Sequence, residues 1–400
     1  MPRAVVVLPS STYRASDFIA AAEALGIDLV VASEQPPPFD MGDRYLQIDC
    51  SDPVAAAQQI AELGDDVALD AVVAADDGGV VVAAMTGAAL ALRSNPTNSA
   101  LATRDKHLLR TMLASAEVPQ PHFGLPSNGA EAAAIAGRIG YPVVLKPLDR
   151  SASQGVIRVD DESALNSTMV EIRRIVGDDT ADVLIEKYIP GSEIAVEGLL
   201  ADGELMVLAI FDKPDTSDGP TFPETIFVTP SRHPLDLQEE AIRVAQRATE
   251  AIGLTHGPVH IELRIDEGIP YIIEIAARSI GGLCSRSLNF GLMGTTLETL
   301  ILRNAIGLDK PELHREPHAS GVLMLPIPRS GRFEGVDGLD DILELPAITG
   351  FDISARIGSP LLAPPEGDSY LGFVYARAED AELVEISLRK AMKRAVVDIT

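Results

Sequence analysis

Basic residues are scarce in this chain of 400 residues, which has 32 Lys plus Arg against 59 Asp plus Glu and a formal net charge of −27 at pH 7. A nucleic-acid backbone repels a protein of this charge, and the chain lacks the basic face that releases counterions from phosphates. The charge balance therefore excludes a dedicated nucleic-acid-binding protein.

Long apolar runs and cysteines are also lacking. No stretch reaches the ~18–20 apolar residues of a membrane span, and the nearest one, 80–92, is broken by Thr86 and Gly87 and predicts a buried helix. The apolar run near the N-terminus is too short for a signal peptide. Cys50 and Cys284 are too few for a disulfide framework and have no metal-ligand spacing. We therefore expect a cytoplasmic protein with no membrane partner.

Strand-like and helical segments alternate over about the first ninety residues, which predicts a parallel α/β layer. The expected strands are 4–8, 27–32 and 71–75, and the expected helices are 15–25, 53–63 and 80–92. The turn after the first strand, 8–12, lacks the Gly-x-Gly-x-x-Gly pattern that brings a backbone close to a dinucleotide pyrophosphate. This argues against a nicotinamide or flavin site there.

The rest of the chain divides into two further parts. A cluster of turn and capping residues, 94–99, marks the first boundary, and Pro-containing segments near 311–317 follow the second. Between them we expect short strands joined by glycine turns over 141–210, a helix over 237–253 and a hairpin over 257–275. The last ninety residues predict a small α/β layer that ends in a helix, 381–395. The expected domains are 1–95, 96–307, with a lid at about 135–200, and 308–400.

The hairpin carries two glutamates on its polar face. A three-residue turn, 267–269, would pair Glu262 with Glu274. Two carboxylates facing each other repel, so we expect a cation between them, and a site of carboxylates plus phosphate oxygens suits Mg²⁺ better than Zn²⁺. The alternative is a solvent-exposed face on which Arg264 neutralises one glutamate. The apolar face is expected to comprise positions 259, 261, 263, 265, 271, 273 and 275.

A second candidate site combines a lysine with a loop of small residues. Lys146 lies on an expected strand and is followed by the loop 151–156. The backbone N–H groups of such a loop can surround phosphate oxygens while the ammonium adds a charge. The loop is not a Walker A motif, and an ordinary hairpin turn is the alternative.

The segment 184–198 predicts a third feature, a strand with one acidic face that carries Glu193 and Glu197. An acidic side chain in a cleft can accept hydrogen bonds from ribose hydroxyls, and a strand edge can pair with a purine. A merely exposed acidic face is the alternative.

Taken in order, these motifs resemble the ATP-grasp superfamily. The series is a helical lysine, the strand lysine with its loop, Glu-Lys-x-Ile-Pro-Gly-x-Glu, and Glu-Ile-Ala-Ala-Arg after the paired carboxylates. The resemblance covers about 95–307. Only seven of the 32 basic residues are lysines, and four of the seven, Lys106, Lys146, Lys187 and Lys213, lie in or beside these motifs.

The resemblance implies a fold in which two α+β subdomains hold ATP, and it implies roles for individual residues. Lys106 and Lys146 would contact the phosphates, Glu193 the ribose, and Arg278 the transferred phosphoryl group. Ser151, Ser153, Gln154 and Gly155 would close over the phosphates, Glu186, Lys187 and Ile189 would line the adenine site, and Glu262 and Glu274 would hold Mg²⁺, or Mn²⁺ in its place.

One position departs from the family pattern. Ala276 stands where many members have an asparagine that also binds metal. This form, followed by Gly281 and Gly282, resembles the branch that contains L-amino acid ligases, as do 213–231 and the C-terminal layer. The branch implies an ADP-forming carboxylate–amine ligase that works through an acyl phosphate on amino acids or small carboxylic acids, and a homodimer would be common for the superfamily.

Two other functions remain open at this point. One is a biotin-carboxylase-like enzyme that phosphorylates bicarbonate, and the other is an ATP-binding regulatory protein without chemistry. The sequence does not identify the substrates. Candidate substrate contacts are Glu224, Ser231, Arg232 and Arg286.

Overall fold

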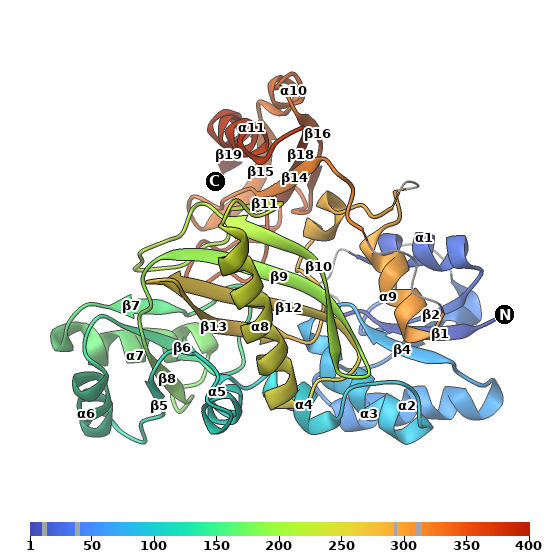
Figure 1. Ribbon diagram of the computed structural model, residues 1–400, viewed down its shortest axis with the longest axis horizontal. Helices are drawn as coiled ribbons and strands as arrows, with labels where there is room; N and C mark the ends of the chain where they lie inside the picture. The colour runs from blue at the N-terminus through green and yellow to red at the C-terminus, as the bar shows by residue number, and fades with distance from the viewer. Residues whose placement is uncertain (10–13, 37–40, 292–293, 309–313) are drawn as a thin grey trace.

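The computed structural model describes residues 1–9, 14–36, 41–291, 294–308 and 314–400 (Figure 1). Two predicted segments lie partly outside the described residues: the turn 8–12, at residues 10–12, and the Pro-containing segment 311–317, at residues 311–313. No helix in these ranges is both long and apolar enough to cross a membrane. The sheets have the strand orders β3-β2-β1-β4, β5-β8-β6-β7, β13-β12-β9-β10-β11-β14-β18-β16 and β17-β15-β19.

The N-terminal layer is a parallel sheet, as predicted. Its elements are β1 (Arg3–Val7), α1 (Ala15–Leu25), β2 (Asp28–Ser33), β3 (Tyr45–Gln47), α2 (Pro53–Asp66), β4 (Ala71–Ala74) and α3 (Val80–Leu90), with short 3₁₀ turns at Gly42–Arg44 and Asp77–Gly79. Strand β3 was not predicted, whereas α3 is the expected buried helix. The carboxyl end of β4 leads into Asp77, which therefore lies at the edge of the sheet where ligands commonly bind.

A small antiparallel sheet backed by two helices covers most of the segment expected to form a lid; Figure 1 shows it as a separate green lobe, which we call the lid. Its elements are β5 (Phe123–Gly124), α6 (Gly129–Ile139), β6 (Val143–Pro147), β7 (Ile157–Val159), α7 (Glu162–Val176) and β8 (Val183–Lys187). It has a hydrophobic core of its own. The prediction of strands alone over 141–210 is wrong at α7, because Asp161 caps a helix that buries Leu165, Met169 and Ile172 at helical spacing.

The central sheet is antiparallel, and helix α8 crosses its face in Figure 1. The elements that build it or lead into it are α4 (Thr97–Ala102), α5 (Lys106–Ser115), β9 (Ser192–Ala201), β10 (Glu204–Lys213), β11 (Ile226–Thr229), α8 (Leu235–Ile252), β12 (Gly257–Asp266) and β13 (Ile269–Ala276). The apolar side of β9, β12 and β13 packs with α8 in one core that also includes residues of the N-terminal layer. This shared core places the N-terminal layer beside the loop after β13.

The C-terminal strands extend the central sheet, because β14, β18 and β16 continue it beyond β11. The remaining elements are a 3₁₀ turn at Cys284–Ser287, α9 (Leu297–Ala305), β14 (Ala319–Met324), β15 (Gly331–Asp337), α10 (Leu339–Leu343), β16 (Ile348–Ile353), β17 (Pro360–Leu361), β18 (Gly372–Ala378), α11 (Ala381–Arg394) and β19 (Val396–Ile399). The C-terminal part therefore borders the same strands that carry the candidate site.

The β12–β13 hairpin has the predicted pairing but not the predicted turn. Glu262 lies opposite Glu274, yet Asp266 pairs with Ile269, so the turn has two residues instead of three. A β-bulge at Ile273 adds the missing residue and restores the pairing. The bulge also makes the predicted apolar face wrong at positions 271 and 273, because Ile272 enters the core in their place and Ile273 lines a pocket.

Gly191, in the turn between β8 and β9, is the position where the backbone most clearly requires glycine. Its φ is +94°, and an added Cβ would lie 2.0 Å from the carbonyl oxygen of Ile265. We expect Gly191→Ala to lower the free energy of unfolding by about 1–3 kcal/mol, measured by urea denaturation.

The matched control is Gly137→Ala in helix α6, where an added Cβ has no neighbour within 4 Å. This change should raise the free energy of unfolding by about 0.5–1 kcal/mol. Equal effects of the two substitutions would contradict the assignment of strain to the 191 turn.

Candidate active site

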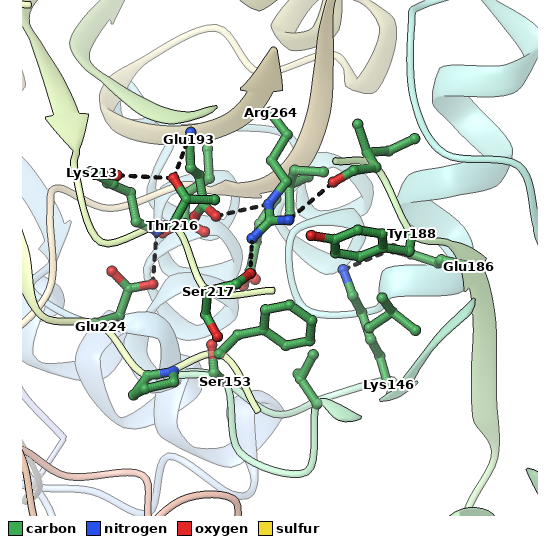
Figure 2. Close-up of a pocket in the computed structure, with 18 of the residues that line it drawn as sticks. Lys146, Ser153, Glu186, Tyr188, Glu193, Lys213, Thr216, Ser217, Glu224 and Arg264 are labelled. Atoms are coloured by element: carbon green, nitrogen blue, oxygen red, sulfur yellow. Dashed lines mark hydrogen bonds and ion pairs between the residues drawn. The ribbon is translucent and has the colours of Figure 1, made fainter. Parts of the chain in front are cut away.

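A pocket of about 800 Å³ lies between the lid and the central sheet, and we call it the inner pocket. Figure 2 shows charged side chains from both walls pointing into it. The polar residues that line it are Lys106, Lys146, Ser153, Glu186, Lys187, Tyr188, Glu193, Lys213, Asp215, Thr216, Ser217, Glu224, Thr225, Glu262, Arg264 and Glu274. Most of the sequence-predicted site residues are therefore together.

Glu186 anchors the lid wall of the pocket. Its carboxylate is buried and accepts from Lys146 Nζ at 2.8 Å and from Arg110 Nε at 2.6 Å. Burial alone would raise the pKa of Glu186, but the two cations outweigh it and hold the pKa at about 2. Both carboxylate oxygens are thus engaged by cations of the protein.

Arg110 was missed by the sequence reasoning. It is buried on α5 and also donates to the carbonyl oxygens of Ile272 at 2.9 Å and Ile273 at 2.6 Å, at the bulge of the metal-candidate hairpin. One guanidinium therefore joins the lid wall to the hairpin. The sequence does not indicate these contacts of Arg110, because α5 has the pattern of an ordinary amphipathic helix.

Lys187 and Ile189 border the pocket where β8 ends. The Lys187 ammonium donates to the carbonyls of Gly140 at 2.9 Å and Tyr141 at 3.3 Å. The carbonyl of Ile189 accepts from Arg264 at 3.0 Å. The predicted adenine-side residues are thus placed around the pocket, with the Lys187 side chain used by the lid itself.

A cluster of three carboxylates forms the opposite wall. Oxygen atoms of Glu193, Glu224 and Glu262 lie within 4.8 Å of one another, and Lys213 lies among them. Figure 2 shows Lys213 beside Glu193 and Glu224. Its ammonium contacts Glu193 and lies 2.8 Å from Glu224 and 3.3 Å from Glu262. The protein therefore supplies its own cation at this wall, and the scarcity of lysine elsewhere was the signal that could have found it.

The charges around Lys213 are unevenly balanced. Burial raises the pKa of Glu224 to about 7, and the neighbouring carboxylates add to that effect while Lys213 opposes it. Burial also opposes the charge on Lys213, but the three glutamates raise the pKa of its ammonium well above the usual value. Arg264 pairs with Glu193 at 3.0 Å, so it does not neutralise the hairpin glutamates as the alternative reading required.

Glu274 differs from the other carboxylates of the pocket. It lies opposite Glu262 and lines the inner pocket, yet among the described side chains no ion pair within 4.0 Å includes it. Burial lowers the pKa of Lys106, which lies near enough for the charge of Glu274 to oppose that shift. Among the described side chains, the cation beside this pair of glutamates is Lys213, and it contacts Glu262 only.

A second pocket of about 510 Å³, the middle pocket, continues from the first. The two share Ser153, Glu224, Glu262 and Glu274. The rest of the middle pocket is lined by Ala152, Phe227, His260, Ala276, Arg278, Ile280, Gly281, Cys284, Met324 and Tyr370. Beyond it an outer cleft of about 1870 Å³ shares Arg278, Gly281 and Tyr370. Three compartments thus adjoin one another and share lining residues.

Arg278 lies at the boundary between the middle pocket and the outer cleft. It donates to Asp77 at 2.9 and 3.1 Å, and not to either hairpin glutamate. Burial opposes the charge of Asp77, but Arg278 and Arg104 outweigh it and lower the pKa of Asp77 to about 2. Asp77 was missed because its partner is 201 residues away in the sequence.

The loop after β6 is held by the C-terminal part. Of its predicted residues, Ser153 lines both inner and middle pockets, whereas Ser151 and Gln154 line the outer cleft. The N–H of Gly155 donates to Pro365 at 2.9 Å, and the Gln154 amide donates to Glu366 at 2.8 Å. Lys106 donates to the carbonyl of Arg150 at 2.5 Å, which ties the start of the loop to α5.

The candidate substrate contacts outside the pockets have protein partners. Ser231 donates to Asp212 at 2.6 Å, and Arg232 pairs with Asp212 and Glu385. Arg286 pairs with Asp17 and Asp352. Of the candidate substrate contacts, only Glu224 lines a pocket described above.

Comparisons with known proteins define the class. Residues 139–287 match the family model described as ATP-grasp domain, and residues 323–400 match that of L-amino acid ligase C-terminal domain 2. These matches confirm the resemblance to the ATP-grasp superfamily and the fold class predicted from the motifs.

The chain is also similar to proteins named as a synthase and a ligase, each over part of its length. It is 27% identical to dapdiamide A synthase of Enterobacter agglomerans over 70% of this chain and 68% of that one. It is 25% identical to alanine–anticapsin ligase of Bacillus subtilis (strain 168) over 56% of this chain and 51% of that one. The crystal structure of L-amino acid ligase from Bacillus licheniformis has the same fold, with a TM-score of 0.83, 24% identity and coverage of 100% and 99%.

The donor set fits a hard divalent cation. Glu262 and Glu274 offer carboxylate oxygens from paired positions of a hairpin, and Glu193 and Glu224 bring two further carboxylates close to Glu262, where Lys213 now lies among them. Ala276 also lines the middle pocket and has no donor atom, so the protein offers one ligand fewer than the family pattern at that position.

Arg110 provides a test of how the walls are joined. We expect Arg110→Met to lower the free energy of unfolding by about 3–5 kcal/mol, because it leaves Glu186 with one cation and two backbone carbonyls without a donor. Urea denaturation measures this.

The control is Arg138→Met on the exposed surface of α6, which should change stability by about 0.5 kcal/mol or less. A loss for Arg110→Met as small as that of the control would mean that the buried network does not hold the two walls together.

Proposed function

We propose that the protein is an ATP-dependent carboxylate–amine ligase that forms an amide or peptide bond between amino acids or small carboxylic acids. The observation that carries this proposal is the position of Glu274. It faces Glu262 and lines both the inner and the middle pockets, between a wall with two lysines and a turn with Arg278. A phosphoryl group passed from one pocket to the other crosses this point.

ATP binds in the inner pocket. The main chain around Ile189 and the Lys187 segment contact the adenine, Glu193 the ribose, and Lys106, Lys146 and the 151–155 loop the phosphates. Glu262 and Glu274 would hold Mg²⁺, which would neutralise phosphate charge and so ease the attack of one anion on another.

The reaction has two steps in the middle pocket. A carboxylate oxygen of the first substrate attacks the γ-phosphorus of ATP, ADP leaves, and an acyl phosphate forms. The amine of the second substrate then attacks the acyl carbon, phosphate leaves and the nitrogen releases protons. Arg278 lies where negative charge develops in both steps. The loop over Ser153, held by the C-terminal turn, excludes water that would hydrolyse the acyl phosphate.

The proposal also includes three domains, 1–95, 96–307 and 308–400. It further includes a cytoplasmic location and a homodimer. The alternatives are a biotin-carboxylase-like enzyme and a non-catalytic ATP-binding protein. Ala276, the pair Gly281-Gly282 and the match of the C-terminal residues favour the ligase over the carboxylase.

A coupled assay of ADP and phosphate release over pairs of amino acids tests the ligase. We expect release only when a carboxylate and an amine are both present with ATP and Mg²⁺, with a condensed product visible by mass spectrometry. Bicarbonate-dependent ADP release with free biotin would replace the ligase by the carboxylase. ATP binding without turnover on any substrate would support the alternative of a non-catalytic ATP-binding protein.

Glu274→Gln tests the metal assignment. The change keeps the side-chain shape but removes one negative ligand, so we expect the Mg²⁺ concentration for half-maximal activity to rise about tenfold or more. Glu267→Gln, in the exposed turn of the same hairpin, is the control and should leave that concentration unchanged. The same Mg²⁺ dependence in both variants would remove Glu274 from the metal site.

A further inference from the structure

Glu197 is the most deeply buried carboxylate around the pockets, and the mechanism above does not use it. It lies on β9 with no exposed surface, directly opposite His260 on β12. Both of its oxygens are within hydrogen-bond distance of described partners. A buried carboxylate is costly to desolvate, so its two contacts decide what it does.

The first contact leads to the metal-candidate carboxylate. Glu197 lies 3.0 Å from Nδ1 of His260, and Nε2 of the same ring lies 3.4 Å from Glu262. The ring also meets the edge of Phe227, with centroids 6.4 Å apart. Because each ring nitrogen faces a carboxylate, the orientation of the imidazole sets the position of Glu262.

The second contact leads to the arginine turn. The N–H of Ile280 donates to both oxygens of Glu197 at 3.1 Å. Ile280 lies two residues after Arg278, and Arg14 donates to Ser279 between them at 2.6 Å. The backbone that carries Arg278 is therefore fixed through the same carboxylate that fixes His260.

We infer that Glu197 is a positioning residue that couples the metal carboxylate to the arginine turn, through His260 on one side and the Ile280 N–H on the other. The inference rests on the proposed function. Outer partners of metal ligands orient those ligands and tune their affinity. Here Glu197 holds both the metal ligand Glu262 and the turn that carries Arg278. Because the metal and Arg278 act on the same phosphoryl group, Glu197 fixes their positions relative to each other.

The test uses two variants that cut the relay at different places. His260→Gln removes the imidazole but leaves the Ile280 contact with Glu197. Glu197→Gln retains the side-chain shape but cannot accept fully from both partners. Glu204→Gln, at the exposed start of the neighbouring strand β10, is the control. Binding of Mn²⁺ in the presence of ADP, measured by electron paramagnetic resonance, gives a readout that does not depend on turnover.

We expect both relay variants to weaken Mn²⁺ binding about 10–100-fold, with binding of metal-free ADP unchanged. Saturating metal should restore kcat in His260→Gln, whereas kcat of Glu197→Gln should stay at least tenfold low because the arginine turn has lost its acceptor. If Glu197→Gln does not fold, the Mn²⁺ affinity and the restored kcat of His260→Gln still test whether His260 positions the metal ligand Glu262.

Unchanged Mn²⁺ affinity in the folded variants, with lowered thermal stability alone, would overturn the inference and leave the proposed function intact. Absence of Mn²⁺ binding by the wild-type protein with ADP would overturn both. Equal recovery of kcat in the two relay variants would overturn the coupling to the arginine turn.

Discussion

Buried carboxylates need partners, and this requirement organises the structure around the three compartments. In a medium of low dielectric constant, a carboxylate without a cation or hydrogen-bond donors is costly. Glu186 therefore has Lys146 and Arg110, the wall of Glu193, Glu224 and Glu262 has Lys213, and Asp77 has Arg278. These pairs join different parts of the chain, so satisfying the charges also fixes the lid, the central sheet and the N-terminal layer around the pockets.

Against this background Glu274 stands out, because no described cation pairs with it although it lines two pockets. A carboxylate left available beside compensated ones is a natural ligand for an added cation. The same logic explains why Lys213 was missed as a partner of Glu262. The repulsion between the hairpin glutamates predicts a cation, but it does not distinguish an ion from a lysine of a neighbouring strand.

Local patterns predicted much of the fold. Helix α1 begins and ends where its apolar spacing indicates, and the alternation of strands and helices predicted the parallel N-terminal sheet. The errors have local causes as well. Helix α7 was not predicted, because its segment contains glycine turns that favoured short strands. The predicted hairpin turn was one residue longer than the observed turn. The pairing of Glu262 with Glu274 was right only because the bulge at Ile273, supported by Arg110, compensates for the shorter turn.

The sequence by itself carried the resemblance to the ATP-grasp superfamily, since the order of four motifs along the chain is a property of the sequence. It also indicated most of the charged side chains that line the inner pocket. The tertiary structure alone decided the partners of those charges: Asp77 for Arg278, Arg110 for Glu186, and Glu197 between His260 and Ile280. The physical reason is that these contacts join residues far apart in sequence, where no periodicity or spacing relates one side chain to the other.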